Sequence, residues 1–101
     1  MKYFISQQMR DKTKEEIKQE REQIISAIKE QDPEAEIIES YFEDYNPDNG
    51  CIPLKYLSKS IELLADANIA YFAKGWESAR GCKIEHDCAV AYGIVVVEDN
   101  N

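Results

Sequence analysis

The sequence contains few basic residues, few cysteines and no long apolar run. Lysine and arginine together number 12 against 20 aspartates and glutamates, so the net charge at pH 7 is −8. Nucleic acids and anionic membranes are bound through basic surfaces, so neither is expected as a partner. Three cysteines are too few for a disulfide framework and indicate a reducing, cytoplasmic compartment. No apolar run reaches the length of a membrane span, and the N-terminus turns polar too soon for a signal peptide.

The chain is long enough for one domain with a single core. Its 101 residues are 44% hydrophobic and 32% charged, as in ordinary globular domains, and we expect residues 1–101 to form one such domain. Short apolar runs predict strands, and apolar residues at helical spacing predict helices. The predicted strands span residues 2–6, 36–42, 68–73 and 94–97, and the predicted helices span residues 13–31, 53–65 and 79–92.

Capping signals support these boundaries. Thr13-Lys14-Glu15-Glu16 has the form of a capping box, Pro53 suits the first turn of a helix, and Gly93 suits a helix stop. Strands that alternate with helices predict a parallel sheet with helices on both faces, that is, a three-layer α/β/α fold. Ligands of such sheets bind at the carboxyl ends of the strands. The loops at that edge would be residues 7–12, 43–52 and 74–78.

Glu85 fits its predicted surroundings less well than any other residue. Gly81 and Ala89 lie four residues away and Cys82 and Cys88 lie three away, so its helix face is small and apolar. A glutamate is rarely buried unless it is paired or in use. Glu85 is therefore either a functional carboxylate or a structural one. If Glu85 is structural, the residues that could pair with it are Arg80, Lys83 and Tyr3.

A metal site is the second chemistry to weigh on this helix. Cys82 and His86 stand one turn apart and could ligate a metal together with Cys51 or Cys88. No paired C-x-x-C accompanies them, and Cys88 lies about 240° round the helix from Cys82. We therefore predict core cysteines beside a surface histidine, and no metal.

Three features of the loops leave alternatives open. Trp76, in the turn Gly75-Trp76-Glu77, either stacks on a base or ribose or plugs the sheet edge or a dimer contact. The acidic stretch at residues 43–48 is either a solvated loop or a lid over the site. Arg10, in a loop before a helix, is expected to face a ligand.

Two stretches carry a resemblance to a known family. Y-F-I-S-Q-Q-M-R near the start resembles the first strand and loop of the nucleoside 2-deoxyribosyltransferase-like proteins. A-D-A-N-I-A-Y-F-A, followed by G-C-K-I-E-H-D-C-A-V-A-Y-G-I, is similar to that superfamily's strand and its G-x-x-x-E-x-x-x-A-x-x-x-G helix. The chain looks most like short bacterial and phage members with Y-I-S-Q-P-M-R-G near the start and F-A-K-G-W-E-x-A-R-G-C-x-I-E-H near the end.

The resemblance implies both a fold and a chemistry. The fold is flavodoxin-like, with a four-stranded parallel sheet in the order 2-1-3-4. The ligand is a nucleoside or nucleotide, no cofactor is used, and the chain pairs as a homodimer. Glu85 is the nucleophile that takes the sugar, and Tyr3 lies close to it and orients it.

Cleaving an N-glycosidic bond with retention also needs a proton donor for the leaving base. Glu77 and Asp66 are the candidates, with Glu43 and Asp44 behind them. A 5′-phosphate would meet backbone N–H groups at the start of the first helix, with Arg10 as charge partner. The whole predicted ligand-binding set is Ser6, Gln7, Met9, Arg10, Gly75, Trp76, Arg80 and Gly81.

The chain also departs from the family pattern. Gln8 stands where the short members have Pro, and Asp11 where they have Gly. Ser58 or Lys59 stands where transferases carry an Asp that handles the base, and no C-terminal extension that closes the pocket follows the fourth strand. Two hypotheses therefore remain: an N-glycosidase or deoxyribosyl transferase, and a protein that binds a nucleotide or an ADP-ribose-derived signal without turnover. A scaffold with a vestigial site is a third.

Overall fold

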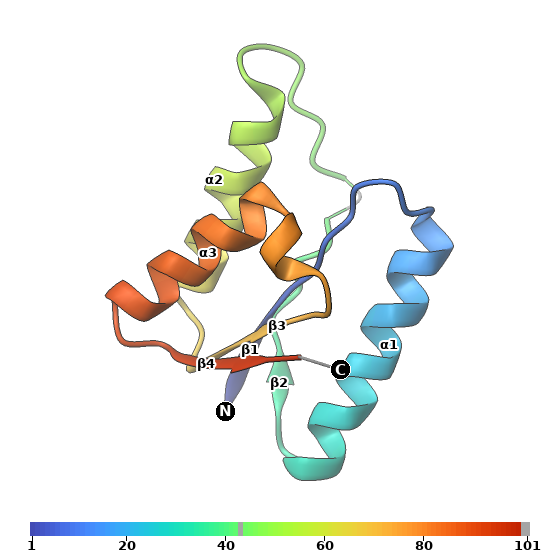
Figure 1. Ribbon diagram of the computed structural model, residues 1–101, viewed down its shortest axis with the longest axis vertical. Helices are drawn as coiled ribbons and strands as arrows, with labels where there is room; N and C mark the ends of the chain where they lie inside the picture. Colours follow the sequence, from blue (N-terminus) through green and yellow to red (C-terminus); the bar gives the residue numbers. More distant parts are fainter. Residues whose placement is uncertain (43, 100–101) are drawn as a thin grey trace.

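Four parallel strands alternate with helices along the chain and form one sheet, as the computed structural model shows for residues 1–42 and 44–99 (Figure 1). The strand order is β2-β1-β3-β4. The predicted α/β class, the alternation of strands and helices and the sheet order 2-1-3-4 are all confirmed. The elements are β1 (Lys2–Ser6), α1 (Lys14–Gln31), β2 (Glu36–Ile37), α2 (Ile52–Leu64), β3 (Ile69–Phe72), the 3₁₀ turn η1 (Trp76–Ser78), α3 (Arg80–Ala91) and β4 (Val95–Glu98).

The helix ends follow the capping signals. Glu16 N donates to Thr13 Oγ1 at 3.1 Å, and Thr13 N donates to Glu16 Oε1 at 3.0 Å, so the predicted capping box is formed at the start of α1. Pro53 lies in the first turn of α2. After α3 the chain turns at Gly93, whose φ of +77° is a left-handed conformation that favours glycine.

The side chains of β1 divide the core between two faces of the sheet. Tyr3 and Ile5 pack toward α1, whereas Phe4 packs toward α2 and α3. Successive residues of a strand point to opposite faces, so Ser6 lies on the same side as Phe4. The core beneath α2 and α3 is formed by Phe4, Leu64, Ala70, Phe72 and Ala89, and the core beneath α1 by Ile5, Ile24, Ile28, Ala35 and Ala73.

The second strand is shorter than predicted. The sequence indicated a strand over residues 36–42, but β2 ends at Ile37. Ile38 O accepts a hydrogen bond from Arg21 Nη2 at 3.0 Å, and Ser40 Oγ donates to Ile5 O at 3.0 Å. Side-chain groups thus make the hydrogen bonds to these backbone carbonyls that a neighbouring strand would make in a longer ladder. The chain therefore leaves the sheet after Ile37.

Within the described part of the chain, no helix combines the length and the apolar character needed to cross a membrane.

Candidate functional site

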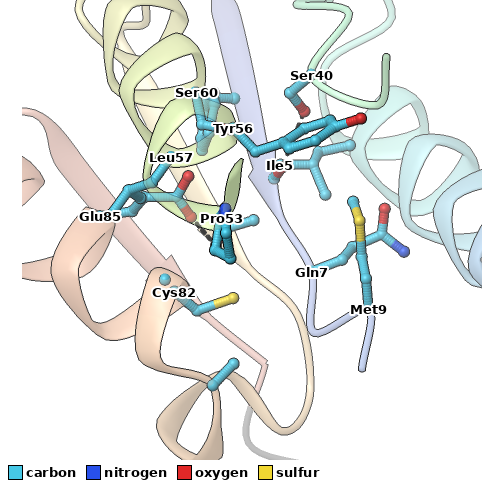
Figure 2. Close-up of a pocket in the computed structure, with 14 residues that line it drawn as sticks. Ile5, Gln7, Met9, Ser40, Pro53, Tyr56, Leu57, Ser60, Cys82 and Glu85 are labelled. Atoms are coloured by element: carbon cyan, nitrogen blue, oxygen red, sulfur yellow. Dashed lines mark hydrogen bonds between the residues drawn. The ribbon is translucent and has the colours of Figure 1, made fainter. Parts of the chain in front are cut away.

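A cavity of about 230 Å³ opens at the carboxyl end of β1, between that strand, α2 and the first turns of α3 (Figure 2). Its polar lining comes from Ser6, Gln7, Ser40, Ser60, Cys82 and Glu85. This is the edge of the sheet at which the sequence predicted a ligand. Sites for drug-sized ligands span about 300–1,000 Å³, so the cavity matches a single ring, such as a sugar or a base, better than a whole nucleotide.

Glu85 supplies the carboxyl group of this cavity. It lies on the face of α3 that packs against the sheet, together with Cys82 and Ala89, and only 7% of it is exposed. Ser6 Oγ, at the end of β1, donates to Glu85 Oε1 at 2.8 Å. Ser60, on α2, is a second hydrogen-bond partner. Each of the three elements around the cavity therefore contributes one group to this cluster.

The carboxyl group of Glu85 has a raised pKa. Burial raises the pKa of its carboxyl group to about 7, although the hydrogen bonds from Ser6 and Ser60 act in the lowering direction. Among the described residues no cation pairs with this carboxylate. Near neutral pH both protonation states are populated, which suits a group that must exchange a proton or attack as an anion.

Cys82 lies beside this carboxyl group but is unreactive by itself. Burial raises the pKa of its thiol to about 11, and the side-chain hydrogen bond with Ser6 only partly opposes this effect. The thiolate is the nucleophilic form of cysteine, so Cys82 is a neutral thiol at physiological pH.

Part of the predicted ligand-binding set does converge on the cavity. Besides Glu85, the lining includes Ser6, Gln7, Met9 and Gly81, all of which were predicted from the sequence. Arg10 and Arg80 are exposed and lie outside the lining.

Tyr3 is on the wrong face of the sheet for its predicted role. It packs against the core beneath α1, whereas Glu85 lies beneath α2 and α3. The alternation of side chains along β1 brings Ser6 to Glu85 and directs Tyr3 away. Ser6 makes the hydrogen bond that had been assigned to Tyr3. The structural partners Arg80 and Lys83 are exposed and do not pair with Glu85 either.

The predicted proton donors are not beside Glu85. Asp66 follows α2 and precedes β3, so it lies at the amino edge of the sheet, opposite the cavity. Glu77, in η1, and Asp44 are exposed and outside the lining. Glu43 lies outside the described residues. No second carboxyl group lines the cavity within the described part of the chain.

Trp76 and Gly75 have packing roles. The Trp76 ring stacks on His86 with centroids 4.2 Å apart, and His86 Nε2 lies 2.6 Å from Glu98 Oε2. Of the two alternatives for Trp76, this geometry matches the plug at the sheet edge. Gly75 has φ +91°, and an ideal Cβ there would come within 2.6 Å of Gln8 Oε1. The left-handed φ favours glycine at this position, whereas the Gln8 oxygen is the end of a flexible side chain and could move aside.

The start of α1 is a poor phosphate site. Its capping box already places the Glu16 carboxylate against the backbone N–H of Thr13, and Glu15 adds a second negative charge in the first turn. A phosphate at this helix start would lie near both carboxylates and be repelled by them. The predicted phosphate position at this helix is therefore not supported.

Four residues of α2 were missed as site residues by the sequence reasoning. Their spacing of three and four residues puts them on one helix face that lines the cavity: Pro53, Tyr56, Leu57 and Ser60. The signal available in the sequence was a serine beside an apolar helical stripe. Tyr56 also stacks on Phe42, and its hydroxyl donates to Tyr45 O, which fixes the loop after β2 against α2.

Metal ligation has no support in the described residues, among which no group of three His, Cys, Asp or Glu side chains could hold an ion. Cys82 faces the cavity and His86 packs on Trp76, so the two lie in different environments.

Comparison with family models, with curated protein sequences and with solved structures finds no match to this chain.

Proposed function

We propose that this protein processes a nucleoside or nucleotide, cleaving its N-glycosidic bond or transferring its deoxyribosyl group, with Glu85 as the nucleophile. One observation carries the proposal: a buried carboxyl group, which pairs with no cation among the residues that the structure describes, lies in the wall of a cavity at the carboxyl edge of a parallel sheet. The resemblance of the sequence to nucleoside 2-deoxyribosyltransferase-like proteins assigns the same residue to the same step.

The proposed chemistry uses the ionised form of Glu85. One carboxylate oxygen attacks the anomeric carbon, the bond from that carbon to the base nitrogen breaks, and the base leaves with the electron pair of that bond. Water or a second base then attacks the same carbon, the bond from that carbon to Glu85 breaks, and Glu85 is released as a carboxylate. The proton that the attacking group loses balances the proton that the departed base takes up from solvent. Ser6 and Ser60 hold the carboxylate in position through their hydroxyl groups.

A non-catalytic binding protein is the second candidate. It is favoured by the absence of a second carboxyl group from the cavity lining among the described residues, because a leaving base needs a proton donor. In that case Glu85 would accept hydrogen bonds from a nucleotide or from an ADP-ribose-derived signal, and the bound molecule would leave unchanged.

We also propose that the protein is a cytoplasmic homodimer of bacterial or phage origin. All three cysteines are free, as is usual in a reducing compartment. The edge strand β4 exposes Val95 and Val97, at 58% and 40%, and an apolar edge of this kind favours pairing.

Incubation with a panel of nucleosides, 5′-nucleotides and NAD-type dinucleotides tests the proposal. Thermal shift reports binding and chromatography reports released base. We expect released base from the wild type and a loss of about a thousandfold or more in Glu85→Gln, as for other nucleophile replacements. Glu77→Gln is the matched control, because Glu77 is exposed and outside the cavity. Stabilisation without product, retained in Glu85→Gln, would select the binding protein, and turnover that persists in Glu85→Gln would refute the nucleophile.

A further inference from the structure

The hydroxyl groups around the cavity have their protons engaged within the protein. Ser6 Oγ donates to Glu85 Oε1, and Ser40 Oγ donates to Ile5 O at 3.0 Å. Ser60 lowers the pKa of Glu85 through its hydrogen bond, so it too donates to the carboxylate. The serine hydroxyls of the lining are therefore engaged within the protein and are not free donors for a ligand.

Gln7 adds the least satisfied acceptor of this lining. It is 7% exposed, and within the described part of the chain its Oε1 is buried without a hydrogen-bond partner. Buried polar atoms are nearly always paired, and leaving one unpaired is costly. An orphaned acceptor in the wall of a cavity indicates a partner that arrives with a ligand.

The amide of Gln7 cannot exchange the places of its oxygen and nitrogen. Its Nε2 donates to Ile17 O at 3.1 Å and to Glu20 Oε1 at 3.0 Å, which uses both protons of the group. Lys12 Nζ lies 3.3 Å from Glu20 Oε1 and fixes that carboxylate. A flipped amide would set its oxygen against two acceptors. Oε1 is therefore fixed as an acceptor and points away from the two groups that Nε2 contacts.

Met9 stands at the same side of the cavity as Gln7. Figure 2 shows both side chains across the cavity from Glu85 and Cys82. Met9 is 40% exposed, and methionine is unbranched and easily changes rotamer. Movement of this side chain is the simplest way for a ligand to reach the amide oxygen of Gln7.

We propose that Gln7 is a specificity-determining residue whose amide oxygen accepts a hydrogen bond from an O–H or N–H group of the ligand. The proposal rests on the proposed function for the class of ligand, a nucleoside or nucleotide. A ligand that presents a donor at this point satisfies the orphaned oxygen. A ligand that presents an acceptor or a bare C–H there leaves it unpaired and is rejected.

Binding of matched nucleosides to the wild-type protein tests the proposal without any substitution. The series is adenosine, its 2′-deoxy, 3′-deoxy and 5′-deoxy analogues, and purine riboside, which lacks the exocyclic amine. Each of the four analogues lacks one donor that adenosine has. We expect one of them to bind about tenfold or more weakly than adenosine, because a single unpaired buried acceptor is worth at least that factor. The identity of that compound tells a sugar O–H from a base N–H.

The substitution Gln7→Met then assigns the discrimination to Gln7. It keeps the length of the side chain and removes the oxygen, so the affinity ratio between adenosine and the weak analogue should fall to within about twofold. Gln8→Met is the matched control, because Gln8 lies outside the cavity lining, and it should keep the wild-type ratio. A loss of stability alone would lower all affinities together and leave the ratio unchanged.

A ligand-induced shift of the Gln7 side-chain amide signals in a ¹H–¹⁵N spectrum is the direct readout, and free adenine and free D-ribose serve as fragment probes. The proposal is overturned if all analogues bind the wild type equally, if Gln7→Met keeps the discrimination, or if neither nucleosides nor fragments shift those signals. Release of base that depends on Glu85 is scored separately, so the proposed function can survive the failure of this inference.

Discussion

Arg21 and Glu85 are buried to the same extent, each 7% exposed, on opposite faces of the sheet. Arg21 is fully engaged: its guanidinium donates to Ile38 O at 3.0 Å and to Ser40 Oγ at 3.3 Å, and the Glu39 carboxylate lies 3.9 Å away. Glu85 has two serine partners and no cation among the described residues, and it faces a cavity.

The difference shows that burial alone does not identify a functional charge. Burial lowers the pKa of Arg21 and the Glu39 carboxylate acts in the opposite direction, but an arginine remains charged. Its hydrogen bonds end β2 and hold the following segment. Burial raises the pKa of Glu85 to about 7, and among the described residues its negative charge is stabilised only by serine hydroxyls and by no cation. A buried charge without compensation is costly to the fold, so a ligand is its natural partner.

The largest effect on stability is expected from replacing Arg21, the buried charge that is hydrogen-bonded within the protein. Arg21→Ala removes two hydrogen bonds from a charged donor and the packing of the aliphatic stem, so we expect a loss of about 3 to 4 kcal/mol. Urea unfolding followed by circular dichroism measures this loss. It should be nearly the same at pH 5 and pH 8, because arginine does not titrate in that range. A loss below about 1 kcal/mol would mean that the network around Arg21 is not structural.

At Glu85 the opposite sign is expected. Between its ordinary pKa of 4.5 and about 7 the folded protein holds a proton that the unfolded chain has released, so the wild type loses stability as pH rises through this window. At about 1.4 kcal/mol per pKa unit the full difference is about 3.5 kcal/mol. Glu85→Gln lacks this titration, and the serine hydroxyls can turn to accept from its amide. The variant should be more stable than the wild type by about 3 kcal/mol at pH 8 and by under about 1 kcal/mol at pH 5. Equal pH dependence in both proteins would show that Glu85 is not desolvated.

The smallest effect is expected at Trp76, which was also predicted to bind the ligand. Trp76→Phe keeps an aromatic ring against His86 and removes an indole N–H that has no partner among the described residues. We expect a loss of about 1 kcal/mol in unfolding experiments and ligand affinity within about twofold of the wild type. A tenfold loss of affinity at unchanged stability would instead show that Trp76 contacts the ligand.

The two buried charges also show which features of the structure could be predicted from the sequence and which could not. Glu85 was identified because its neighbours at helical spacing are small and apolar, and that pattern is local. Arg21 was not singled out from the sequence, because its burial depends on Ser40 and Ile38, which reach it only after the chain has crossed from α1 to β2. The early end of β2 was missed for the same reason.

The error at Tyr3 has a different origin. Tyr3 and Ser6 both belong to β1, and the alternation of the strand allows only one of them to face Glu85. Ser60 and Tyr56 come from α2, whose position against α3 is set by the tertiary fold. The strand order could be predicted through the resemblance and from the alternation of elements, whereas side-chain partners across elements required the structure.

The most direct measurement is a ¹³C-carboxyl NMR titration of Glu85, made first on the free protein and then on the protein with the tightest-binding nucleoside of the panel. We predict a titration midpoint near pH 7 in the free protein. When the nucleoside is bound, we predict that both this midpoint and the chemical shift of the carboxyl carbon change. A midpoint near 4.5, unchanged by any nucleoside or nucleotide, would contradict the central claim that Glu85 is an uncompensated carboxyl group reserved for a ligand.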